Sequence, residues 1–132
     1  MAGLVPYLYL PGTAREALTF YQGVFGGELQ LHTYKQFQRE DGPGEAIAHG
    51  ELGGGPVPLF ASDAVEGEPT LSMAGMHFSL LGTADAATMR GWFEQLSGGG
   101  TVVDPLQVRP WGDSDGQVVD RFGVHWLIGF QD

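Results

Sequence analysis

The sequence predicts an α+β fold made of two βαβββ modules. Two segments carry apolar residues at helical spacing, and each has one strand-like segment before it and three after it. The two expected helices end in similar glycine-rich segments, 25–27 and 96–98, which lie about seventy residues apart and indicate an internal repeat. The 22 glycines and 8 prolines suit short elements joined by tight turns.

The first module is expected over residues 4–63. Through residues 4–10, leucine or proline at the even positions alternates with valine or tyrosine at the odd positions, which predicts a strand. A helix follows, with Thr13 as its N-cap and Glu16 completing a capping box, and Gly26 ends it. Three further strands are expected at 28–37, 45–52 and 57–62.

The second module is expected over residues 71–130, after the polar segment 63–70. Residues 76–81 alternate as a strand, Thr83 is expected to cap the second helix, and Gly98 ends it. Strands are expected at 101–109, 116–120 and 124–130. One such module leaves a face of its sheet uncovered, so we expect both modules to form a single domain over 1–132.

Composition excludes several functions. The net charge of −10, with 6 basic residues, argues against nucleic acid, because phosphate contacts need clustered lysine and arginine. The absence of cysteine excludes disulfides, thiolate metal sites and cysteine nucleophiles. No segment predicts a signal peptide or a membrane span, so we expect a cytoplasmic protein without a membrane partner.

Three segments resemble a known family. Residues 14–29 are similar to the first helix of the vicinal oxygen chelate superfamily, which includes glyoxalase I, bleomycin-resistance proteins and extradiol dioxygenases. Segments 47–52 and 111–126 resemble its PhnB-like branch, whose members often carry a demethylubiquinone methyltransferase-like label. The resemblance implies two βαβββ modules whose curved mixed sheets surround a shared cavity. The methyltransferase label has no support, since no strand is followed by a Rossmann-type glycine loop.

The resemblance also indicates whether a metal is expected. Metal-dependent members place four ligands on inward strand positions, two in each module. The corresponding positions here are Pro6, Phe60, His77 and Leu127. Sliding the alignment by one or two residues brings in Tyr7, Ser62, Asp63 and His125, but no single shift completes a set. Only His77 of the aligned set is a donor, and a divalent cation needs about four to six, so we expect no metal and no cofactor.

Two histidines are predicted to face the cavity. His49 and Glu51 are two residues apart on a strand and therefore share a face. They are either a ligand-binding or acid–base pair in the cavity or a polar face outside it. His77 alternates with apolar neighbours, and is either a cavity base or ligand anchor or a histidine bonded to backbone or water.

Aromatic residues complete the predicted cavity. Aromatic side chains on strands usually belong to a core or an interface, but the resemblance places Tyr7, Phe60 and Leu127 at the cavity. Trp111 precedes a turn, where it would either close the cavity mouth or pack on the second module. With carboxylates nearby, such a cavity would suit a cationic or planar ligand through stacking and cation–π contacts.

Two glycine-containing motifs predict no chemistry. Residues 112–116 match the Gly-x-Ser-x-Gly string of hydrolases, which needs a sharp strand-to-helix turn. Here the string lies between two expected strands, which favours an acidic β-turn. Residues 53–55 lack the following lysine and serine or threonine of a phosphate-binding loop.

The sequence leaves three functions open. We favour a small-molecule-binding protein of the PhnB-like type, without a catalytic metal. The alternatives are a divalent-metal-dependent lyase, isomerase or dioxygenase, and a structural or interaction protein whose cavity is filled. A homodimer is expected, because members of the superfamily often build the cavity across a two-fold axis, and because sheet edges invite pairing between chains.

Overall fold

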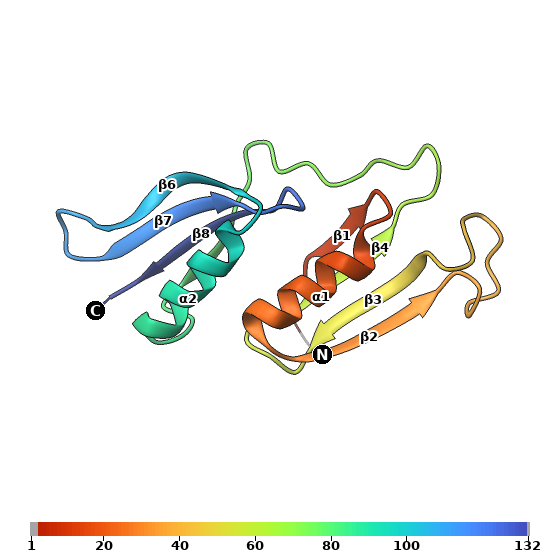
Figure 1. Cartoon of the computed structure of the whole chain (residues 1–132), viewed down its shortest axis with the longest axis horizontal. Helices are drawn as coiled ribbons and strands as arrows, with labels where there is room; N and C mark the ends of the chain where they lie inside the picture. The colour runs from red at the N-terminus through yellow and green to blue at the C-terminus, as the bar shows by residue number, and fades with distance from the viewer. Residues whose placement is uncertain (1–2, 132) are drawn as a thin grey trace. The chain divides into compact units, whose positions relative to one another are not determined.

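The computed structural model describes residues 3–131 and contains two compact units (Figure 1). One unit ends at Leu71 and the other begins at Ser72, and we call them module 1 and module 2. Each has the element order strand, helix, strand, strand, strand, so the α+β prediction of two βαβββ modules is confirmed. That they form one domain around a shared cavity stays a prediction.

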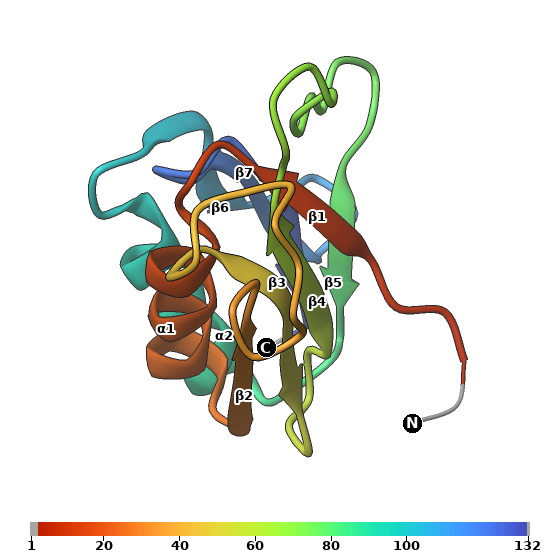
Figure 2. The same ribbon diagram turned by 90° about the vertical axis from the view of Figure 1, so that its right-hand side faces the viewer.

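Module 1 is a four-stranded mixed sheet covered on one face by a helix. Its elements are β1 (Tyr7–Leu10), α1 (Ala14–Phe25), β2 (Glu28–Thr33), β3 (Ile47–Gly53) and β4 (Leu59–Asp63). The strand order is β1-β4-β3-β2, with β1 parallel to β4 and the other pairs antiparallel. Figure 2 shows α1 lying along the sheet. Its apolar stripe, including Leu18 and Tyr21, is buried together with Leu8 and Leu10 of β1.

The close approach of α1 to its sheet depends on Gly50 of β3. A Cβ atom at this position would lie 2.6 Å from Cδ1 of Leu18, which projects from the helix. Glycine therefore leaves the space that the leucine side chain fills. A larger residue would push the helix away from the strand that carries the polar residues described below.

Module 2 repeats this architecture. Its elements are β5 (Phe78–Leu81), α2 (Ala86–Ser97), β6 (Thr101–Val108), β7 (Ser114–Val119) and β8 (His125–Phe130). The strand order is β5-β8-β7-β6, with β5 parallel to β8. The core lies between α2 and the sheet and contains Met89, Trp92, Phe93, Leu96, Val118, Trp126 and Ile128.

The helices are short. Each has 12 residues, whereas a membrane-spanning helix needs about 20 apolar residues. Within residues 3–131, no helix has the length and apolar character needed to cross a membrane.

Thr13 is the N-cap residue of α1, as predicted, but its predicted side-chain cap does not form, and the predicted cap of the second helix is wrong. Thr13 makes no side-chain capping bond. Instead, the buried carboxylate of Asp63 accepts the N–H of Ala14 at 2.9 Å, because the end of β4 lies beside the start of α1. At the second helix Asp85, not Thr83, is the N-cap and accepts the N–H of Thr88 at 2.8 Å. A carboxylate is an acceptor-only group that also favours the positive end of the helix dipole.

Several strand boundaries also differ from the predicted ones. The first strand begins at Tyr7 rather than at residue 4. The second ends at Thr33, because the chain turns through 34–38 and Gln38 adopts a positive φ of 56°. Asp63 belongs to β4 rather than to the polar connection, and β7 begins at Ser114, two residues before the predicted start.

The Asp-Arg-Phe-Gly segment is part of the sequence that resembles the PhnB-like branch, and it has a structural role in module 2. Asp120 is 3% exposed, and one of its carboxylate oxygens accepts the N–H groups of Phe122 and Val124. The other oxygen accepts the indole N–H of Trp126 at 2.8 Å. Arg121 donates to the carbonyl of the residue that follows α2. The segment therefore joins the β7–β8 turn to the core and to the end of the helix.

Candidate functional site

The sheet of module 1 has an open face on the side opposite α1. Strand alternation buries Leu8 and Leu10 of β1 but leaves Tyr7 and Tyr9 43% and 44% exposed. The parallel partner strand β4 places Phe60 in register with Tyr7, with ring centroids 6.0 Å apart. The structure therefore brings two predicted site residues, Tyr7 and Phe60, side by side.

A hydrogen-bonded chain crosses this open face. The hydroxyl of Tyr7 lies 2.8 Å from Nδ1 of His49, and Nε2 of His49 lies 3.1 Å from Oε1 of Glu51. His49 and Glu51 share a face of β3, as their spacing predicts, and Tyr7 reaches them from β1. We call Tyr7, His49, Glu51 and Phe60 the open-face cluster.

Glu51 determines how the hydrogens of this chain are arranged. An ionised carboxylate only accepts, so the Nε2 of His49 that faces it carries the hydrogen. In a neutral imidazole the other nitrogen then accepts, and Tyr7 donates its hydroxyl hydrogen to Nδ1.

Tyr7 also keeps its proton at neutral pH. Burial raises the pKa of Tyr7, and a hydrogen bond from Ser62 opposes that shift. The phenol is therefore an anchored, protonated group in the chain.

Aromatic rings surround the chain of hydrogen bonds. The rings of His49 and Phe60 have centroids 5.5 Å apart, as do those of Tyr7 and His49. Tyr9 meets the edge of Tyr7 at 5.4 Å. These contacts hold the rings in place and leave a partly exposed surface on which a planar molecule can stack.

The open face of module 2 carries a pair of histidines. The ring of His77 stacks on that of His125 with a centroid separation of 4.1 Å. Nε2 of His125 lies 2.9 Å from the amide oxygen of Gln117. Burial, and to a smaller extent the charge of His77, lower the pKa of His125. A charge on His77 therefore disfavours a second charge on His125.

Leu127 lines an open pocket of about 540 Å³ in module 2. The pocket lies where β5 and β8 end and α2 begins, and neither histidine lines it. Its lining is mixed, with apolar Leu81 and Phe130 beside the carboxylates of Asp113 and Asp115. The structure thus places Leu127 in a pocket, and His77 outside it.

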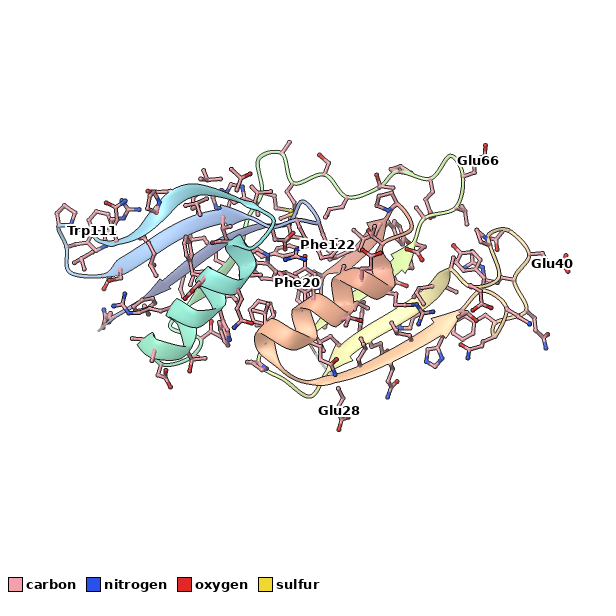
Figure 3. The ribbon with its side chains drawn as sticks, viewed as in Figure 1. Phe20, Glu28, Glu40, Glu66, Trp111 and Phe122 are labelled. Carbon is pink, nitrogen blue, oxygen red and sulfur yellow. The ribbon has the colours of Figure 1, made fainter. Side chains whose placement is uncertain are left out.

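Trp111 lies at the tip of the β6–β7 hairpin (Figure 3). It is 68% exposed, so it is not packed into module 2, and it does not line the pocket. Its predicted contact with a ligand stays a prediction.

The Gly-x-Ser-x-Gly string lies in the same hairpin. Ser114 is the first residue of β7 and is 2% exposed, while Gly112 belongs to the turn before it. The string therefore joins two strands. It does not have the strand-to-helix geometry that exposes a nucleophilic serine.

The residues present do not fit the metal site of the family. The aligned positions Pro6, Phe60 and Leu127 carry no metal donor. His125 joins His77 on module 2, which gives two imidazoles where a divalent ion needs about four donors. Among residues 3–131, no three histidine, aspartate or glutamate side chains form a group that could hold a metal ion.

The sequence pointed to a partner for each predicted histidine, because Glu51 shares a strand face with His49 and His125 is an alternative ligand position. Glu51 orients His49, and His125 stacks on His77. The spacing of two residues between His49 and Glu51 pointed to the first. The second needed the pairing of β5 with β8, which brings together residues far apart in the sequence.

Comparison with known proteins establishes the family. The model of the glyoxalase/bleomycin resistance protein/dioxygenase superfamily matches residues 3–128. The chain belongs to this superfamily, so the resemblance described for the sequence is confirmed.

Individual relatives agree with this assignment. The chain is 28% identical to the protein YjdN of Escherichia coli K12, over 95% of this chain and 92% of the relative. It is 32% identical to the protein PA1353 from Pseudomonas aeruginosa, with a TM-score of 0.81 and coverage of 99% and 98% of the two chains.

A PhnB protein from Bacillus cereus also shares the fold. The TM-score is 0.78, with 20% identity over 98% of this chain and 99% of that one. The solved structures that resemble this chain therefore include a PhnB-like protein.

Proposed function

We propose that this chain binds a small aromatic molecule on the open face of module 1, without a resident metal ion. The observation that supports this is the open-face cluster, in which aromatic rings surround the hydrogen-bonded chain from Tyr7 through His49 to Glu51. The rings offer stacking area and the polar chain offers a directional contact, which is the usual composition of a small-molecule site.

The aromatic rings of the open-face cluster lie outside the core of module 1. The core of module 1 lies between the sheet and α1, where Leu8 and Leu10 are almost completely buried. Tyr7 projects to the other side and remains 43% exposed. An aromatic ring that is fixed by neighbours and still exposed loses little conformational entropy when a ligand stacks on it.

The test is equilibrium binding of naphthalene-sized aromatic probes, followed by probe fluorescence. We expect micromolar to millimolar affinity for the native chain and at least a fivefold loss in Phe60→Ala. Met76→Ala, which removes an exposed apolar side chain from module 2, is the control and should bind normally. If no probe binds, or if both variants bind as the native chain does, the proposal is wrong.

A metal-dependent enzyme of the same superfamily is the second candidate. The contact between His77 and His125 favours it, because two imidazoles already lie together on module 2. Elemental analysis of protein purified without chelators is the test. Near-stoichiometric zinc, nickel, manganese or iron that disappears in His77→Ala would favour the enzyme and contradict metal-free binding.

We also propose that the chain forms a homodimer through the edge strand β6. Among residues 3–131 this strand pairs on one side only, with β7, and Val102, Val103 and Val108 are exposed along it. An apolar strand edge is a ready site for pairing with a second copy. Sedimentation equilibrium at micromolar concentration should show a dimer that Val103→Lys dissociates, and a stable native monomer would contradict this proposal.

A further inference from the structure

We propose that the open-face cluster selects an aromatic ligand that carries a hydrogen-bond donor, of which a phenolic O–H is the simplest case. This inference rests on the proposed function and adds the chemical class of the ligand. The atom that receives the ligand's hydrogen is the phenol oxygen of Tyr7.

The first step is the tautomer of His49. The carboxylate oxygen of Glu51 lies 3.1 Å from Nε2, and a carboxylate has no hydrogen to donate. The hydrogen of the neutral ring is therefore on Nε2. Nδ1 then has a lone pair and is an acceptor.

The second step is the direction of the Tyr7 hydroxyl. Nδ1 accepts at 2.8 Å, so the single hydroxyl hydrogen of Tyr7 is used within the cluster. A phenol oxygen also has two lone pairs. The same oxygen can still accept a hydrogen, and Tyr7 is 43% exposed, so a ligand can reach it.

The third step is the polarity that the cluster shows to a ligand. Tyr7 has no second hydrogen, and Glu51, which is partly exposed, has only acceptor oxygens. A ligand hydroxyl can bond to these atoms. At the Tyr7 and Glu51 oxygens, a ligand oxygen without a hydrogen would meet acceptor atoms and would lose its bond to water without gaining another.

The experiment compares 2-naphthol with 2-methoxynaphthalene, which has the same ring system but no donor. Binding is measured at about pH 8, where imidazoles are mostly neutral. We expect 2-naphthol to bind at least tenfold more tightly to the native chain. Tyr7→Phe should remove this preference and leave the affinity for 2-methoxynaphthalene within about twofold.

Thr19→Val is the control. It removes an exposed hydroxyl from α1, which lies on the opposite side of the sheet from the open-face cluster. The tenfold preference should persist in this variant. Thermal unfolding of both variants establishes that they are folded.

Glu51→Gln tests the tautomer directly. A carboxamide can donate as well as accept, so it no longer fixes the hydrogen on Nε2. The preference for 2-naphthol should fall at least threefold, and the imidazole ¹⁵N chemical shifts of His49 should change from those of a single tautomer to those of a mixture. A merely structural role of Glu51 would weaken both probes equally.

The outcomes separate the inference from the proposed function. If neither probe binds, the proposed function fails. If both probes bind equally to the native chain, or if Tyr7→Phe keeps the preference, the inferred selection of a ligand with a hydrogen-bond donor is wrong, but the proposed binding site is not contradicted.

Discussion

The two modules have the same topology but use their buried aspartates differently. In module 1, Asp63 at the end of β4 accepts the first N–H of α1 and, at 2.8 Å, the N–H of Ile47 at the start of β3. In module 2, Asp120 accepts two N–H groups of the β7–β8 turn and the indole of Trp126. The repeated fold therefore does not require a repeated polar anchor, because each module joins its strand ends in its own way.

The open faces of the two sheets also carry different residues. Tyr7 and Phe60 are paired on β1 and β4 of module 1, where the hydrogen-bonded chain to Glu51 begins. On module 2, where β5 and β8 are the corresponding strands, His77 contacts His125 instead. The same fold thus carries hydrogen-bond acceptors and aromatic rings on the sheet of module 1, and a pair of imidazoles on the sheet of module 2.

The largest expected effect comes from removing the aspartate anchors. Asp120→Ala removes the carboxylate that accepts three N–H groups and should lower the free energy of unfolding by roughly 3–6 kcal/mol. Asp63→Ala leaves two and should cost roughly 2–4 kcal/mol. Urea denaturation measures both values.

The asparagine variants are the controls for these anchors. Each keeps one oxygen acceptor and should lose less stability than the alanine variant. A stability loss below about 1 kcal/mol for either alanine variant would show that the carboxylate is not the anchor that the structure describes.

The helix caps distinguish the two modules on a smaller scale. Asp85→Ala should cost about 1 kcal/mol, because its carboxylate accepts an N–H of the first turn of α2. Thr13→Ala should change stability by no more than about 0.5 kcal/mol, because the cap of α1 comes from Asp63. Thermal unfolding would contradict this difference if Thr13→Ala were the more damaging substitution.

The smallest effect is a pH dependence specific to module 2. The pKa of His125 is lowered in the folded chain, so the unfolded chain binds its proton at a higher pH. The stability that this histidine contributes is present above about pH 6.5 and is lost as the pH falls through the lowered pKa. Urea midpoints between about pH 7.5 and pH 5 should fall less in His125→Gln than in the native chain, and equal falls would contradict this origin.

Sequence periodicity predicted the βαβββ order of both modules, because each helix and strand buries one side. It missed Asp63 as a cap, because Asp63 and Ala14 are separated by 49 positions in the sequence and come into contact only after β1 pairs with β4. It paired His49 with Glu51 through their local spacing. It did not connect Tyr7 to His49, which lie 42 residues apart on strands that β4 separates.

The most direct test of the central claim is to map 2-naphthol on the isotope-labelled chain by NMR. The account predicts that chemical-shift changes are largest at Tyr7, His49, Glu51 and Phe60, and that they are absent in Phe60→Ala at the same probe concentration. Changes confined to Leu127 and its neighbours in the pocket of module 2 would contradict it.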